Sequence, residues 1–139
     1  MSVEHFLDTN VFVYLFDETN DHKRGRAVRL VQESLVNETG CISYQVVQET
    51  INVIIRKLNA TPEKARQILD DTLIPLWRVN PTLMLYQRSL DLQTRYRFSF
   101  YDSLIVAAAL EAGCHTLYSE DLTHSQQIEG LTVTTPFRT

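Results

Sequence analysis

Residues 5–10, His-Phe-Leu-Asp-Thr-Asn, set the pattern on which the chain is built: a short apolar run that ends in an acid. The apolar residues predict a short buried strand, and Asp8 lies at its carboxyl end. The run Thr116-Leu117-Tyr118 repeats this arrangement, and Asp121 comes shortly after it. Ligands of open α/β sheets bind outside the carboxyl ends of the strands. We therefore expect both acids at one ligand-binding edge of a sheet.

The rest of the chain alternates short apolar runs with longer segments of helical periodicity, which predicts an α/β fold with a parallel sheet covered by helices. The expected strands are residues 4–8, 40–42, 76–79, 116–119 and 131–134. The expected helices are residues 9–16, a segment around 27–35, 44–58, 62–72, one from Pro81 to about 96 and one from Ser99 to Gly113. The connections are short, so we expect one domain over residues 1–139.

Four polar residues mark the expected helix starts. Ser43 and Ser99 are predicted to cap helices with their hydroxyl groups. Thr61 precedes Pro62, and Asn80 precedes Pro81, which is typical of a capping residue followed by proline in the first turn.

Composition favours an ordinary globular protein. Apolar residues make up 44% of the 139 residues and charged residues 22%, and no apolar run is long enough to span a bilayer. The start of the chain does not resemble a signal peptide. The two cysteines, Cys41 and Cys114, form neither a disulfide framework nor a zinc pattern. A cytoplasmic location without membrane attachment is the expectation.

A net charge of −4 is unusual for a protein that binds nucleic acid by charge alone. Basic residues nevertheless occur in two clusters, which either contact a nucleic-acid backbone or, as we favour, are simply solvated helix faces. The clusters are Lys23, Arg24, Arg26 and Arg29, and Arg95 with Arg97.

Asp102 and Glu49 lie inside helical segments. Asp102 shares a helix face with Ile105 and Val106, and a carboxylate on an apolar face needs hydrogen-bond donors or a cation. Glu49 lies at the border of an apolar helix face, beside Val46, where a glutamate is usually only solvated. Its interest is that its helix directly follows an expected strand.

Each acid also has a plain structural interpretation. Asp8 and Asp102 could be helix caps, and Asp121 could belong to a polar turn. Either Glu120 or Asp121 could point toward the other acids, since the sequence does not decide which side chain turns inward. Asn10 and Ser119 could support the acids by hydrogen bonding.

Together, Asp8, Glu49, Asp102 and Asp121 predict a divalent-cation site, because clustered carboxylates repel one another unless a cation lies between them. Oxygen-only ligands suit Mg²⁺ or Mn²⁺, which points to metal-assisted phosphoryl chemistry and most of all to nucleic-acid cleavage. The four histidines have no spacing typical of zinc, and neither a glycine-rich phosphate loop nor a Ser/His/Asp arrangement is present.

With these residues placed, the chain resembles PIN-domain nucleases, and closely the VapC-like toxins of bacterial toxin–antitoxin pairs. The resemblance covers nearly the whole chain in order and spacing, although residues 59–97 carry little of it. The matching segments are Phe6–Val11, Ser43–Glu49, Phe98–Ile105 and Leu117–Leu122, with Pro136-Phe137 near the end.

The resemblance implies a three-layer α/β/α sandwich and a Mg²⁺- or Mn²⁺-dependent endoribonuclease. It assigns the acidic quartet to Asp8, Glu49, Asp102 and Asp121, with Asn10 and Ser119 in support. It also implies an RNA substrate, a cognate antitoxin that blocks the site, and a homodimer.

Two other functions stay open. Asp8 could be the nucleophile of a haloacid dehalogenase-like phosphatase, although such enzymes usually carry a second acid where this chain has Asn10. A PIN-like RNA-binding or scaffold protein with an idle site is the alternative outside the enzymes. The apolar segment Val11–Phe16 either packs internally or is partly covered by a partner such as an antitoxin.

Overall fold

A computed structural model describes residues 3–138. Its sheet has the strand order β3-β2-β1-β4-β6-β5. All neighbouring strands are parallel except β5 and β6, which are antiparallel. The strands are β1 (His5–Leu7), β2 (Gly40–Ser43), β3 (Trp77–Val79), β4 (Thr116–Tyr118), β5 (Gln127–Ile128) and β6 (Leu131–Thr134).

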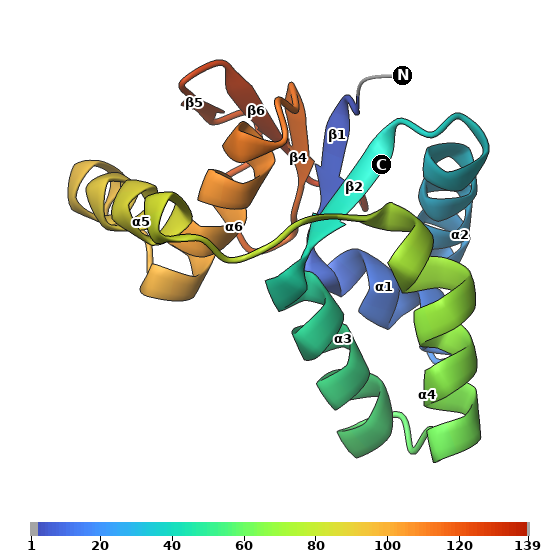
Figure 1. Cartoon of the computed structure of the whole chain (residues 1–139). Coiled ribbons are helices and arrows are strands. Elements are labelled where there is room, and N and C mark those ends of the chain that lie inside the picture. Colours follow the sequence, from blue (N-terminus) through green and yellow to red (C-terminus); the bar gives the residue numbers. More distant parts are fainter. Residues whose placement is uncertain (1–2, 139) are drawn as a thin grey trace.

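Helices cover both faces of this sheet, which gives the expected three-layer α/β/α sandwich (Figure 1). From β1 to β3 the chain steps across the sheet in one direction, and from β3 to β4 it steps back. Right-handed crossovers then put α1–α4 on one face and the tightly packed pair α5 and α6 on the other. The helices are α1 (Thr9–Phe16), α2 (Asp21–Val36), α3 (Tyr44–Arg56), α4 (Pro62–Ile68), α5 (Leu83–Tyr96) and α6 (Phe100–Glu111).

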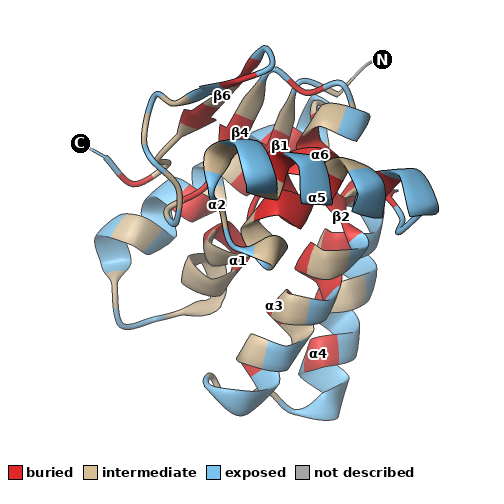
Figure 2. Cartoon of the chain, turned by 90° about the vertical axis from the view of Figure 1, so that its left-hand side faces the viewer, coloured by how far each residue is buried: buried red, intermediate tan, exposed pale blue. Residues whose placement is uncertain are grey.

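The reversal of direction places β1 between β2 and β4, and this is the point in an open α/β sheet where ligands bind. Phe6 and Leu7 of β1 and Leu117 of β4 have no exposed surface, so the centre of the sheet is buried on both faces. Figure 2 shows this buried centre behind the more exposed outer faces of the helices. Residues that immediately follow β1 and β4 are therefore held by a rigid core.

Most element types and positions agree with the sequence-based expectations, and the exceptions concern helix ends and the last hairpin. The helix expected over residues 62–72 is α-helical only to Ile68, continues as a π-helical turn over Leu69–Leu73 and tightens to a 3₁₀ turn over Ile74–Leu76. Strand β5, which pairs with β6 as a hairpin, was not expected, because a two-residue strand has too little periodicity to detect.

Capping is confirmed at Thr61 and Ser99 and was wrong at two other positions. The hydroxyl of Thr61 accepts from the backbone of Lys64, as expected. Helix α5 is capped by Thr82 rather than started by Asn80-Pro81, because the Thr82 hydroxyl accepts the Leu85 N–H at 3.1 Å. Ser43 occupies the cap position of α3 but makes no capping bond, and its buried hydroxyl has no partner among the described residues.

The two cysteines are free and buried, with the sulfur atoms of Cys41 and Cys114 3.5 Å apart. Among the helices within residues 3–138, none combines the length and apolar character needed to cross a membrane.

Candidate active site

Asp8 is the most buried acid of the site, with 4% of its surface exposed. It follows β1 and occupies the N-cap of α1, where the Thr9 N–H donates to its Oδ1 at 2.7 Å. The Ser119 hydroxyl donates to its Oδ2, also at 2.7 Å. Asp8 is therefore a helix cap, as the structural interpretation allowed, and it is also fixed to the loop after β4.

Burial raises the pKa of Asp8 to about 7. The hydrogen bonds from Ser119 and Thr9 oppose this rise, while the negative charges of Asp121 and Glu49 add to it. Repulsion from both acids means that they lie near Asp8, although they come from other parts of the chain. The ionised form of Asp8 is thus kept only at a cost in free energy.

Asp121 reaches the site from the loop after β4. Its backbone N–H donates to the Ser119 hydroxyl at 3.2 Å, and the Asn10 amide donates to its Oδ2 at 3.3 Å. Ser119 is fully buried and links Asp8 to Asp121, because its hydroxyl donates to one and accepts from the other. The side-chain oxygen of Asn10, Oδ1, is buried and has no hydrogen-bond partner within residues 3–138.

Glu49 comes from the second turn of α3 and is half-buried. The Thr9 hydroxyl donates to its Oε1 at 3.0 Å, which connects it to the start of α1. Thr9 was not among the expected site residues. Its place between Asp8 and Asn10 was the only sequence signal, and the contact with Glu49 forms only in the fold.

Asp102 lies in the first turn of α6, where its backbone N–H donates to the capping hydroxyl of Ser99 at 3.1 Å. The side chain is half-buried, and the pKa of its carboxyl is raised, first by burial and then by the charge of Asp121. Asp102 therefore faces the same region as Asp121, across the end of the sheet from α1.

Glu120 points elsewhere. It forms an ion pair with Lys23 of α2 and accepts a hydrogen bond from the Tyr14 hydroxyl at 3.2 Å. Asp121 is consequently the acid of this loop that joins the others, and Glu120 is part of a neutralised contact. Sequence reasoning missed Lys23 and Tyr14 here, because their separation from Glu120 along the chain leaves no local signal.

The acidic cluster, defined as Asp8, Glu49, Asp102 and Asp121, has no ion pair with any of residues 3–138. As placed, no three Asp, Glu, His or Cys side chains of that part of the chain lie close enough together to enclose a single ion. The links between the acids run through Thr9, Asn10 and Ser119 instead. A shared cation would require some of the carboxylates to turn toward it.

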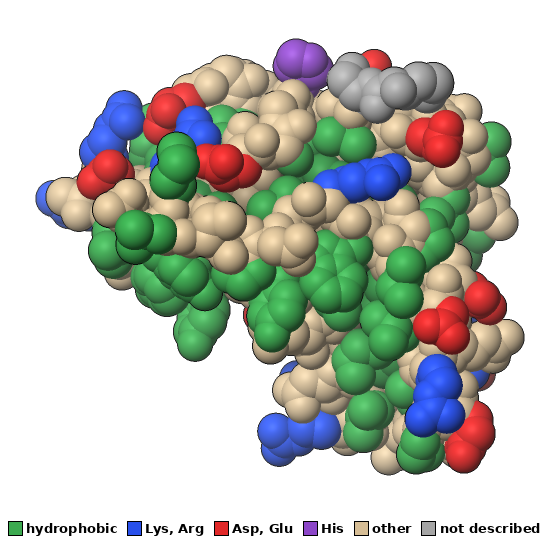
Figure 3. Space-filling model, in the orientation of Figure 1, with side chains coloured by type: hydrophobic (Ala, Val, Ile, Leu, Met, Phe, Trp, Pro, Cys, Tyr) green, Lys and Arg blue, Asp and Glu red, His purple; other side chains and the backbone are tan. Residues whose placement is uncertain are grey.

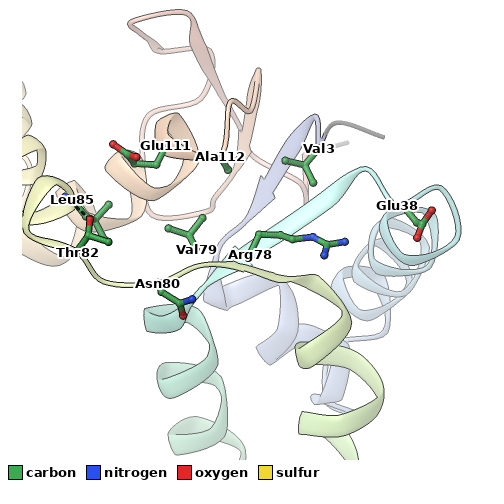
Figure 4. A pocket seen from close by; sticks show the side chains of 9 residues that line it. All are labelled: Val3, Glu38, Arg78, Val79, Asn80, Thr82, Leu85, Glu111 and Ala112. Carbon is green, nitrogen blue, oxygen red and sulfur yellow. Dashed lines mark hydrogen bonds between the residues drawn. The ribbon is translucent and has the colours of Figure 1, made fainter.

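A hollow of about 570 Å³ beside the edge strand β3 contains none of these acids. Arg78, Asn80 and Glu111 are among its lining residues, and it reaches Val3 near the start of β1 (Figure 4). It therefore lies away from the carboxyl end of β1, where Asp8 sits, and it is not the candidate site.

The PIN domain family model matches residues 5–127, so the chain belongs to the PIN domain family. This span includes the whole acidic cluster and all strands except β6 and the end of β5. No curated protein matches the chain in sequence.

Solved structures with the same fold include several toxins. A Mycobacterium tuberculosis VapC20 structure, described as a Sarcin-Ricin loop cleaving toxin, is 21% identical at a TM-score of 0.64, covering 85% of this chain and 90% of that one. A toxin–antitoxin complex from Klebsiella pneumoniae is 18% identical at 0.67, covering 98% and 100%. DNA-bound VapBC from Salmonella typhimurium is 19% identical at 0.67, covering 94% and 96%. At these identities the likeness establishes the fold alone.

Proposed function

We propose that this chain is a Mg²⁺- or Mn²⁺-dependent endoribonuclease that acts in the cytoplasm as the toxin of a toxin–antitoxin pair. One observation carries the proposal. Four carboxylates from four separate segments lie in one region at the switch point of the sheet, and no basic side chain of residues 3–138 forms an ion pair with them. Family membership and the toxins among the structures of the same fold support the same function.

The chemistry of the side chains fits a hard divalent cation. All candidate ligands are oxygen atoms, and the buried Asn10 carbonyl oxygen supplies an unpartnered acceptor beside Asp121. A cation near Asp8 would also offset the burial and repulsion that raise its pKa. Asp8, Asp102 and Asp121 would hold one or two ions, with Glu49 completing the shell.

A bound divalent ion would supply a water of lowered pKa and would stabilise charge on the phosphate. The chain's own residues position the carboxylates for this. Ser119 and the Thr9 N–H fix both oxygens of Asp8, and Asn10 orients Asp121. Glu49, which accepts a hydrogen bond from Thr9, would either complete the shell of such an ion or orient the attacking water.

Metal-titrated cleavage of RNA, run beside a small phosphate ester, tests the activity. We expect RNA cleavage that needs Mg²⁺ or Mn²⁺, stops with EDTA and survives a zinc-selective chelator. Cleavage that continues in excess EDTA would contradict the metal site. Hydrolysis of the ester without RNA cleavage would favour the phosphatase, and RNA binding without cleavage would favour the idle scaffold.

The proposed antitoxin needs a docking surface, and α1 provides one. Of the apolar segment Val11–Phe16, only Val11 and Phe12 are fully buried. Leu15 and Phe16 instead line a hollow of about 410 Å³ together with apolar side chains of α3 and α4, including Ile54 and Ile68. An apolar stretch of the antitoxin would fill this hollow, and an Arg beside it could pair with the acidic cluster in competition with metal.

Co-purification from the native operon tests this partner. We expect a small protein, encoded beside this chain, to copurify and to inhibit cleavage. Phe16→Glu in α1 should weaken that binding while leaving RNA cleavage by the isolated chain active. A chain that is harmless when expressed alone and copurifies with no inhibitor would contradict the toxin assignment but not the nuclease.

A second copy of the chain is the other proposed protein partner. Large apolar side chains are exposed on α5, among them Leu83 and Met84 with 73% and 69% exposed, and Tyr44 of α3 is also exposed. In Figure 3 hydrophobic side chains gather over α5 and along α3 on the same face. Burial of this face in a symmetric dimer predicts that Leu83→Glu shifts the mass measured by light scattering toward that of the monomer.

A further inference from the structure

One face of α2 carries cations that the fold does not use. Arg26 and Arg29 are exposed and have no ion pair with any described residue, and His22 is exposed one turn before Arg26. In contrast, Arg88 and Arg95 pair with glutamates. Most Arg and Lys side chains within residues 3–138 also have no ion pair. What distinguishes Arg26 and Arg29 is that they lie one turn apart on one helix face, beside His22.

Gly25 lies on this face in the second turn of α2, and no structural requirement explains it. Its backbone φ is not positive, and a Cβ added there would meet no atom within 4 Å. Glycine inside a helix lowers stability relative to alanine. Gly40 differs, because there a Cβ would lie 2.4 Å from the Cβ of Ser34.

The missing side chain opens the surface of the helix. A hollow of about 450 Å³ is lined by Gly25, His22, Arg26 and Arg29, with Asp21 at its amino-terminal end. At Gly25 a ligand can therefore approach the helix backbone closely while basic side chains flank it.

This face continues toward the candidate active site. A second hollow, of about 170 Å³, brings Arg26 and Arg29 together with Tyr118 of β4 and Pro136, with Glu33 at its far end. Tyr118 directly precedes Ser119 in the chain. Lys23, which also belongs to α2, forms an ion pair with Glu120, the residue after Ser119. The basic face of α2 thus borders the loop that carries Asp121.

We propose that His22, Gly25, Arg26 and Arg29 form a binding strip for the phosphate backbone of the RNA, beside the site of cleavage. The inference rests on the proposed ribonuclease function and names where the substrate is held. Two guanidinium groups one turn apart match phosphate oxygens, because each can donate two hydrogen bonds at once. Gly25 lets the phosphate backbone of the RNA lie directly against the helix. An acidic protein would not require this space, because its carboxylates reach the arginines on flexible side chains.

RNA binding by the full chain in EDTA tests the strip without cleavage. The probe is a labelled single-stranded RNA, and affinity is measured over a series of salt concentrations. Arg26→Gln with Arg29→Gln should weaken binding, and the slope of log affinity against log salt should fall by about 0.7 for each lost phosphate contact. Arg56→Gln with Lys57→Gln, which removes the same two charges at the exposed end of α3, is the matched control.

Gly25→Ala separates recognition from stability. We expect it to raise the melting temperature, because alanine favours the helix, and to weaken RNA binding, because its Cβ fills the floor of the strip. Gln32→Ala, also exposed on α2, controls for a substitution in this helix and should leave RNA affinity unchanged. Unchanged affinity in Gly25→Ala would overturn the close approach of RNA at this position.

The outcomes separate this inference from the proposed activity. Strip-dependent RNA binding without metal-dependent cleavage would support the strip and contradict the nuclease. If the parent chain cleaves RNA, but the Arg26 and Arg29 variant binds RNA as tightly as the control at the end of α3, the strip alone would be overturned. The RNA strip would also be overturned if binding of polyglutamate, but not of RNA, depended on Arg26 and Arg29. These arginines would then bind an acidic protein.

Discussion

Two acids in one loop, Glu120 and Asp121, have opposite surroundings. Glu120 is paired with Lys23 and accepts from Tyr14. Within residues 3–138 the Asp121 carboxylate accepts only from the Asn10 amide, and it lies near the carboxylates of Asp8 and Asp102. The Lys23 ammonium group thus pairs with the residue that directly precedes Asp121, and not with the acidic cluster itself. The acidic cluster therefore lacks a basic partner even though the neighbouring Glu120 has one. This is what we expect of the proposed site, which would receive its cation from solution.

Replacing an acid of the cluster should have the largest effect. Asp8→Asn keeps an acceptor for the Thr9 N–H but removes a charge, so RNA cleavage should fall by at least about 100-fold. Asp102→Asn should do the same. Cleavage rates under saturating Mg²⁺, together with circular dichroism to verify folding, measure this. Parent-level cleavage in both variants would contradict the site assignment, and unfolding would favour purely structural capping.

The pH dependence of stability should show the cost of the unpaired cluster. Without metal, folded Asp8 keeps its proton up to about pH 7, whereas the unfolded chain loses it near the ordinary aspartate pKa of 3.8. The folded state therefore binds more protons in this window, and the free energy of unfolding should decrease as pH rises through it. Denaturant titrations should show a loss on the order of 2–4 kcal/mol.

Asp8→Asn should flatten this pH dependence and be more stable than the parent at pH above about 7 without metal, because no charge needs to be buried. Added Mg²⁺ should reverse the order by stabilising the parent. If the parent's stability instead rises between pH 4 and 7 relative to the variant, the carboxyl is not held protonated by its surroundings.

The link between Asp8 and Asp121 should have an intermediate effect. Ser119→Ala removes the hydroxyl that donates to Asp8 and accepts from the Asp121 N–H. Since the hydrogen bond to Ser119 lowers the pKa of Asp8, its loss should raise that pKa further. Apparent metal affinity or cleavage should fall by about 10–100-fold, measured by Mg²⁺ titration of activity. Ser119→Thr, which keeps a hydroxyl, should recover part of the loss.

The paired acid should matter least. Glu120→Gln breaks an ion pair whose side chains remain 27% and 30% exposed, so unfolding should become easier by no more than about 1 kcal/mol. Cleavage should stay close to that of the parent. A loss as large as that of Asp8→Asn would mean that Glu120, and not only Asp121, belongs to the site.

The sequence predicted the proximity of Asp8 and Asp121 better than it predicted where the helices begin and end. Asp8 and Asp121 could be placed because strand and acid are adjacent in the chain, and the structure brings them together through Ser119. Their assignment as metal ligands stays a prediction. The end of α4 and the cap of α5 were misplaced, because helix ends depend on which nearby hydroxyl reaches a free N–H.

The sequence by itself determined the alternation of strands and helices, and with it the parallel sheet and the acids at its carboxyl edge, since apolar periodicity and strand ends are local properties. Only the tertiary structure decided which acid of the Glu120-Asp121 pair lies near the other acids of the cluster. Lys23 draws Glu120 toward α2, and Asn10 meets Asp121 at the start of α1. Both contacts join residues far apart in the chain, so their geometry exists only after the layers have packed.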